Sequence, residues 1–237
     1  METWLVQLLG THLVLDYLQK DISNQDIGIT KNGDNYFLSS AAWNLISDVV
    51  TISKLAEDYI KYLNVTANMF YPGQSNISVD KIIEEIGNEE KTTHVLGAAN
   101  ITLGSIIVTR PSLNSSNGKL MESEVEMCLR ISRSDQRVFD AMHFFNEGTW
   151  VSLYKVYEII DEDLTSEGVN IIKLAWTTKK EKNRFTQTGQ SFDSIGYEAR
   201  HAKKTFTPHS NPMTLTEAKS FVRFILCKWI KRKDGDV

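Results

Sequence analysis

The stretch TLTEAKSFVRFILCKWIKRK, residues 214–233, is the clearest structural signal in the chain. It opens with a capping box, in which the Thr214 and Glu217 side chains each bond the backbone of the other residue. The basic run 231–233 closes it, at the negative end of a helix dipole. Between them, apolar residues recur every three or four positions: Leu215, Ala218, Phe221, Val222, Ile225, Leu226 and Trp229. This pattern predicts a long amphipathic helix.

The residues before this helix have helical spacing as well, back to position 119. The predicted helices cover 122–131, 134–145, 150–160, a short stretch at 168–176, and 178–200, the last with an interruption near Gly189 or Gly196. Ser134 and Thr149 are the expected N-caps of the second and third helices. The run Asp161-Glu162-Asp163 is interpreted as a solvated helix end, because adjacent carboxylates point in different directions on a helix and so do not share a cation.

The first 110 residues predict a mixture of strands and helices. Strands are expected over 4–9, 27–30, 36–38, 92–96 and 101–109, and helices over 12–18, 48–63 with a continuation to 70, and 79–86. Asn32-Gly33 between two apolar runs predicts a β-hairpin. The polar stretch 111–118 has no periodicity and is expected to link two domains. The predicted fold class is therefore α+β, with a sheet-and-helix domain at 1–110, a linker at 111–118 and an all-α helical bundle at 119–237.

Charge is distributed unevenly along the chain. The net charge is −4, but residues 173–233 hold fourteen basic and four acidic residues, whereas residues 1–172 hold twelve basic and twenty-four acidic ones. A basic segment in an acidic protein indicates a binding surface for a polyanion, or a contact with the acidic half of the same protein. Aromatic residues interleaved with the basic ones suit stacking on bases, or packing in a core: Trp176, Phe185, Phe192, Tyr197 and Phe206.

Several protein classes are excluded because their motifs are missing from the sequence. Glycines never fall at the spacing of a phosphate-binding loop, and neither a GxSxG nor an HExxH pattern occurs. We therefore expect no kinase, P-loop ATPase, dinucleotide-dependent dehydrogenase or serine hydrolase, and neither a metal site nor a cofactor. Cys128 and Cys227 are expected to be reduced thiols. With no apolar run long enough for a membrane span and an acidic start untypical of a signal peptide, the predicted location is cytoplasmic, with no membrane partner.

The densest group of reactive side chains is Tyr197-Glu198-Ala199-Arg200-His201-Ala202-Lys203-Lys204, followed by His209. If the helix continues through Lys204, Glu198 lies beside His201 and favours its imidazolium form. These components suit metal-independent RNA cleavage, which needs a proton acceptor, a proton donor and cations at the phosphate. The candidate catalytic residues are Glu198, Arg200, His201 and His209, and the candidate RNA-binding residues are Lys182, Arg184, Lys203 and Lys204. In the structural alternative, Glu198 pairs with a neighbouring cation and Arg200 holds the His-Ser-Asn-Pro loop.

Residues 150–158 (WVSLYKVYE), 184–188 (RFTQT), 198–201 (EARH) and 211–218 (NPMTLTEA), with LLGTHLVLDYL and YFLSS near the N-terminus, resemble a family of uncharacterised bacterial proteins. The C-terminal domain of that family resembles HEPN domains. The resemblance implies a helical bundle that forms homodimers and cleaves RNA in toxin–antitoxin or phage-defence systems, through an arginine followed closely by a histidine.

Here eight residues separate Arg200 from His209, and Pro208 interrupts them. Two functions therefore stay open. The first is RNA engagement, with metal-independent cleavage. The second is a non-catalytic interaction or scaffold role for a degenerate HEPN-like domain.

Overall fold

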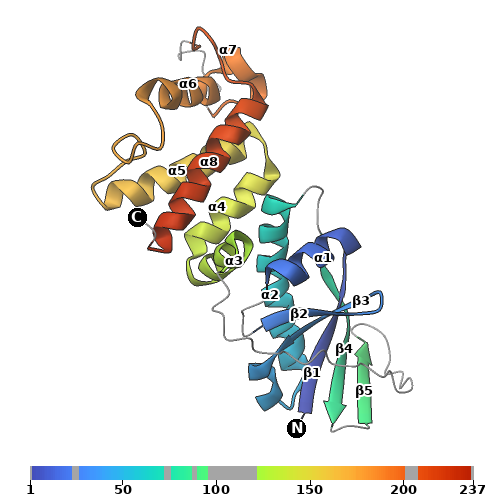
Figure 1. Cartoon of the computed structure of the whole chain (residues 1–237). Coiled ribbons are helices and arrows are strands. Elements are labelled where there is room, and N and C mark those ends of the chain that lie inside the picture. The colour runs from blue at the N-terminus through green and yellow to red at the C-terminus, as the bar shows by residue number, and fades with distance from the viewer. Residues whose placement is uncertain are drawn as a thin grey trace. The chain divides into compact units, whose positions relative to one another are not determined.

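The computed structural model describes residues 2–22, 27–71, 76–86, 90–95, 122–200 and 208–235 (Figure 1). The chain divides into two compact units, an N-terminal unit of residues 1–129 and a helical unit of residues 130–237. The predicted linker at 111–118 lies outside the described residues, so the sequence-based domain boundary stays a prediction.

The N-terminal unit is built on an antiparallel sheet with the strand order β2-β3-β1-β4-β5. Its strands are β1 (Glu2–Leu9), β2 (Ile27–Asn32), β3 (Asn35–Ser40), β4 (Ser78–Ile86) and β5 (Glu90–Val95). The central strand β1 pairs with β3 on one side and β4 on the other. Val6 of β1 stands opposite Leu38 of β3 and Ile82 of β4, and all three side chains are fully buried. Side chains in one row across a sheet point to the same face, so this row fixes the register of the three central strands.

Helices cover the face of the sheet to which this row belongs (Figure 1). They are α1 (His12–Asp21), the short 3₁₀ helix η1 (Ala41–Leu45) and α2 (Val49–Phe70). Leu18 of α1 and Ile52 and Leu63 of α2 are fully buried in one core with Val6. Asp48 caps α2 by accepting hydrogen bonds from the backbone N–H groups of Val50 and Thr51.

The structure confirms the mixed α+β class, the strand over 4–9, the hairpin and the helix that extends to Phe70. The predicted helix over 79–86 is wrong, because these residues form strand β4. Their apolar spacing suits either structure, and the deciding interaction is not local, because β4 pairs along its length with β1. The other edge of β4 pairs with β5, the next strand in the sequence. The predicted strand at 101–109 lies outside the described residues.

The helical unit consists of α4 (Gln136–Glu147), α5 (Trp150–Ser166), α6 (Lys179–Gln190), the short α7 (Phe192–Ile195) and η2 (Gly196–Glu198), and α8 (Leu215–Lys233). Helix α3 (Glu124–Ser134) runs across the division between the units. Helices α4, α5 and α8 pack against one another, and α6 packs on α5. Fully buried residues from all four helices form the core: Val138, Met142, Leu153, Ile160, Phe185, Val222, Ile225 and Trp229.

The N-cap predicted at Thr149 and the capping box predicted at Thr214 are confirmed at the starts of α5 and α8, and Thr149 forms a capping box as well. The predicted N-cap at Ser134 is wrong. Asp135 caps α4 by accepting the Arg137 N–H, whereas the Ser134 hydroxyl donates to the carbonyl of Ile131 at the end of α3. The helical arrangement is thus established for the described residues, and the HEPN-like identity of the bundle stays a prediction.

In the ranges that the structure describes, none of the helices combines the length and the apolar composition needed to cross a bilayer. Among the same residues, His, Cys, Asp and Glu side chains do not gather in threes where a metal ion could bind.

Candidate functional site

Three of the predicted site residues contact one side of helix α5. We call this side the α5 face and define it by Trp150, Tyr154, Tyr157, Glu158 and Asp161, which are spaced three or four residues apart. Helix α6 and the segment that follows it lie along this face. The two helices approach closely at Gly189, where a Cβ atom would lie only 2.7 Å from the Tyr154 ring.

Arg200 is placed on the α5 face by both its backbone and its side chain. Its backbone N–H donates to the carbonyl of Gly189 at 2.9 Å. Its guanidinium lies 2.6 Å from the Glu158 carboxylate and 5.1 Å from the centre of the Tyr154 ring. The Arg200 and Glu158 side chains are 44% and 40% exposed, so an external ligand can reach both.

The Tyr154 ring packs against the Arg200 guanidinium of this pair. Its side chain is buried, and its hydroxyl accepts a hydrogen bond from the Gln190 amide at 2.8 Å. Burial raises the pKa of Tyr154, while the Gln190 and Arg200 hydrogen bonds act in the opposite direction. The ring therefore stays neutral and offers its face to the guanidinium.

Glu198 lies at the start of the α5 face. Its carboxylate accepts the backbone N–H of Trp150 at 3.3 Å, at the N-terminus of α5, where the helix dipole favours a negative charge. The structural alternative expected a cation beside Glu198. Among the described residues, Glu198 instead pairs with the N-terminus of α5.

The placement of Glu198 beside His201 depended on a helix that continues through Lys204, and the chain leaves the helical conformation at Ala199, whose backbone is extended with φ −67° and ψ 140°. Gly196, with φ 63°, ends α7, and the backbone of Arg200 is then tied to Gly189. The condition for placing Glu198 beside His201 is therefore not met. His201, Lys203, Lys204 and Phe206 lie outside the described residues.

Lys182 contacts the far end of the α5 face from helix α6. Its ammonium lies 3.7 Å from the Asp161 carboxylate and 5.8 Å from the centre of the Tyr157 ring. Glu198, Arg200 and Lys182 thus follow one another along α5, although none of the three belongs to that helix.

Arg184 and His209 are placed elsewhere, at the segment that precedes α8. Arg184 donates to the carbonyls of Asn211 at 2.9 Å and Pro212 at 3.3 Å, and pairs with Glu217 at 2.8 Å. His209 Nδ1 accepts the backbone N–H of Asn211 at 3.0 Å. The structural role expected of Arg200, holding the His-Ser-Asn-Pro loop, is therefore performed by Arg184.

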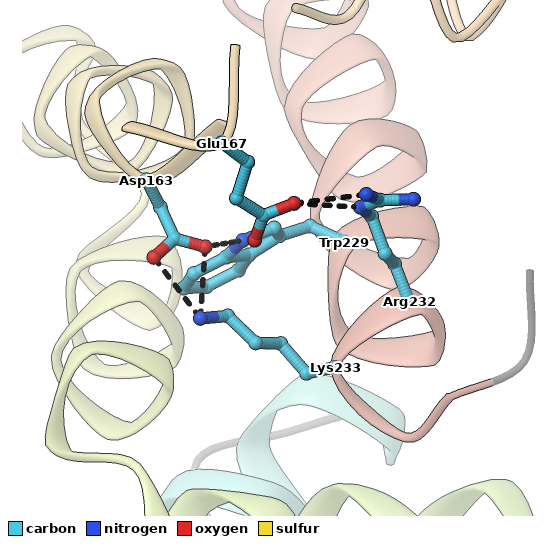
Figure 2. Close-up of a pocket in the computed structure, with 5 residues that line it drawn as sticks. All are labelled: Asp163, Glu167, Trp229, Arg232 and Lys233. Atoms are coloured by element: carbon cyan, nitrogen blue, oxygen red, sulfur yellow. Dashed lines mark hydrogen bonds and ion pairs between the residues drawn. The ribbon is translucent and has the colours of Figure 1, made fainter. Parts of the chain in front are cut away.

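The sequence interpretation also missed an ion network around the buried Asp163, part of which Figure 2 shows beside a cavity of about 150 Å³. The Asp163 carboxylate accepts the Trp229 indole N–H at 2.8 Å and lies 2.8 Å from the Lys233 ammonium and 2.5 Å from the Arg137 guanidinium. Asp163 is only 3% exposed, so its interpretation as part of a solvated helix end is wrong. Its spacing of three from buried Ile160 was the available signal.

No protein-family model, curated protein or solved structure matches this chain. The geometry of the described residues is therefore the basis for the function proposed below.

Proposed function

We propose that the helical unit binds RNA and cleaves it without a metal ion, with the Arg200–Glu158 pair as the reaction centre. The observation that carries this proposal is an accessible guanidinium held 2.6 Å from an accessible carboxylate. The surrounding unit has eighteen basic and fourteen acidic residues, whereas the N-terminal unit has eight and sixteen. A polyanionic substrate is therefore attracted more strongly to the helical unit.

In the proposed reaction, the 2′-hydroxyl of a nucleotide attacks its own 3′-phosphorus. Glu158 accepts the proton of that hydroxyl, and Arg200 stabilises the negative charge that develops on the phosphoryl oxygens. The bond to the 5′-oxygen breaks, giving a 2′,3′-cyclic phosphate and a 5′-hydroxyl. His201, the predicted proton donor for this leaving oxygen, lies outside the described residues, and His209 stays the second predicted donor.

A bacterial toxin or phage-defence setting and a homodimer through the helical unit belong to this proposal, because the HEPN resemblance implies them. The cytoplasmic location belongs to it as well, and Cys128, buried in α3 as a thiol, agrees with a reducing compartment.

The second candidate is a non-catalytic interaction or scaffold protein, and one observation favours it. Each described basic residue of the candidate site already has a carboxylate partner inside the helical unit: Arg200 with Glu158, Lys182 with Asp161 and Arg184 with Glu217. A cation that is paired in this way contributes less to phosphate binding than a solvated one.

The test is an RNA cleavage assay in EDTA with single-stranded and hairpin RNA. Glu158→Gln should lower the cleavage rate by about 10²-fold or more while RNA binding persists, because a general base is lost and not a cation. Glu162→Gln is the charge-matched control, since Glu162 is an exposed carboxylate on the same helix, one turn after Glu158. The His201→Ala/His209→Ala double variant tests the proton donors.

Binding is measured in parallel across a range of salt concentrations. Arg200→Ala should weaken RNA binding and reduce the salt dependence by about one phosphate contact. RNA binding without cleavage by the unmodified protein would support the scaffold function. Equal binding by the protein and Arg200→Ala at low salt would remove the phosphate role of Arg200.

A further inference from the structure

A second site lies in the helical unit, in a groove between the start of α6 and the exposed side of α8. Its volume is about 420 Å³, which is in the size range of small-ligand sites. We call it the Trp176 groove. Its apolar walls are Trp176, Phe221 and Phe224, and its polar rim includes Thr177, Glu181 and Ser220.

The aromatic walls are accessible, which distinguishes them from the core. Phe224 is 49% exposed, and the ammonium of Lys228 lies 5.9 Å from the centre of its ring. Trp176 is half-buried, while the other four tryptophans, Trp4, Trp43, Trp150 and Trp229, are at most 5% exposed. The groove thus presents flat aromatic surface to solvent, and every nucleobase can stack on such a surface.

The backbone that presents Trp176 is strained. Ala175 has φ 56°, and among the described residues it is the one non-glycine residue with a positive φ. The turn is held by two hydrogen bonds, from the Ala175 N–H to Ile172 and from the Trp176 N–H to Ile171, both 2.9 Å. A left-handed alanine is less favourable than glycine. The two bonds have the pattern of a Schellman turn, which fixes the backbone on which Trp176 is carried.

The carboxylate of Glu181, on the rim of the groove, can accept further hydrogen bonds. Glu181 lies 4.0 Å from the Arg184 guanidinium, at the outer limit of an ion pair, whereas Arg184 is much closer to Glu217 at 2.8 Å. Half of the Glu181 side chain is exposed. A carboxylate only accepts hydrogen bonds, so a partner with neighbouring donors on one edge suits it best.

We propose that the Trp176 groove binds an unpaired guanine. The ring would stack on Trp176 and Phe224, and its adjacent N1–H and N2–H donors would both bond the Glu181 carboxylate. On its base-pairing edge, adenine or cytosine has one amino group beside an acceptor nitrogen, and uracil has one N–H between two carbonyl oxygens. Each of these bases would therefore place an acceptor next to the carboxylate and form a weaker contact than guanine. Where the guanine belongs to RNA, the proposal rests on the function proposed above. A free guanine nucleotide would present the same base to the groove.

Tryptophan fluorescence of the full-length protein tests the groove without RNA. Because Trp176 is the accessible tryptophan, GMP should quench the red-shifted part of the emission, more strongly than AMP, CMP or UMP after correction for absorbance. Trp176→Phe should lose this quenching. Equal quenching by GMP and UMP would overturn guanine selectivity.

Two variants locate the interactions. Glu181→Gln should weaken GMP binding about tenfold or more, because two hydrogen bonds to a charged acceptor are lost. The variant keeps the helix start, since the Thr178 cap bonds the backbone N–H of residue 181. Glu162→Gln is the charge-matched control. Phe224→Ala should weaken binding of all nucleotides through loss of stacking. Unchanged GMP affinity in Glu181→Gln would overturn the assignment.

The RNA arm compares oligouridine with the same oligomer carrying one central guanosine. Tighter binding of the guanosine oligomer, lost in Glu181→Gln, supports the proposal. RNA binding without such a preference overturns the guanine site and leaves the proposed function standing. GMP binding without RNA binding supports the groove as a nucleotide site and overturns the RNA function.

Discussion

Replacement of Asp163 by asparagine is the sharpest test of the packing of the helical unit. Asp163→Asn keeps the shape of the side chain and removes its charge, in a place that is only 3% exposed. The Lys233 ammonium, 2.8 Å away and 18% exposed, and the Arg137 guanidinium at 2.5 Å lose their shared partner. An amide N–H₂ group would also point toward one of these cations.

The expected loss of stability is about 3 kcal/mol. Removal of one partner from a buried ion pair costs about 3–5 kcal/mol. The lower end applies because Lys233 keeps Asp135 at 3.2 Å and the Arg137 side chain is 56% exposed. Glu167→Gln in the same cavity is the matched control. It breaks the Glu167–Arg232 pair, whose side chains are 41% and 26% exposed, so its cost should be at most about 1 kcal/mol.

The assay is hydrogen–deuterium exchange of α5 and α8 peptides at increasing urea concentrations, which reports the helical unit by itself. Asp163→Asn should shift the midpoint of opening to lower urea, and the shift should persist in high salt, because a buried pair is poorly screened. Equal stability of Asp163→Asn and Glu167→Gln would refute the reasoning.

Three further predictions concern local features of the same unit. Ala175→Gly should stabilise it by about 1 kcal/mol in urea unfolding, because φ 56° suits glycine better than alanine, and a loss of stability would contradict this. Gly189→Ala should destabilise it by about 2 kcal/mol in the same assay, since the new Cβ would meet the Tyr154 ring at 2.7 Å, and tolerance of this change would show that α5 and α6 can separate. The pKa of Glu217 is lowered from 4.5 to about 2, first by the Thr214 backbone N–H and then by Arg184. Its contribution to stability is therefore complete above pH 4.5 and is lost as pH falls toward 2, and unfolding midpoints between pH 5 and 2 should fall less steeply in Glu217→Gln than in the unmodified protein.

Local signals predicted those elements whose ends and faces are fixed by neighbouring residues. Thr149 and Thr214 begin their helices with hydrogen bonds inside one turn, and the β2–β3 hairpin turns at Gly33, whose φ is 59°. The prediction for β4 failed because the central strand with which it pairs, β1, lies some seventy to eighty residues earlier. Spacing inside residues 79–86 carries no information about that pairing.

The candidate site was predicted in part for the same reason. The reactive character of Glu198 and Arg200 was visible in the sequence, but their partners Trp150 and Glu158 lie on a helix some forty residues earlier. An interruption near Gly196 was predicted, but the hydrogen bond from the Arg200 N–H to the Gly189 carbonyl, which follows the extended backbone at Ala199, could not be predicted from local spacing.

The order of the strands has a consequence for the time course of folding during synthesis. Strand β1 emerges from the ribosome before the other four strands, yet it occupies the middle of the sheet. Its buried residues are Trp4, Val6 and Leu8. The strand that pairs with its second edge, β4, is synthesised only after α1, the hairpin and α2. Until then one edge of β1 presents unpaired backbone groups beside apolar side chains, which is the surface that chaperones and aggregating partners recognise. The N-terminal unit therefore passes through its most vulnerable stage while the helical unit is still unmade.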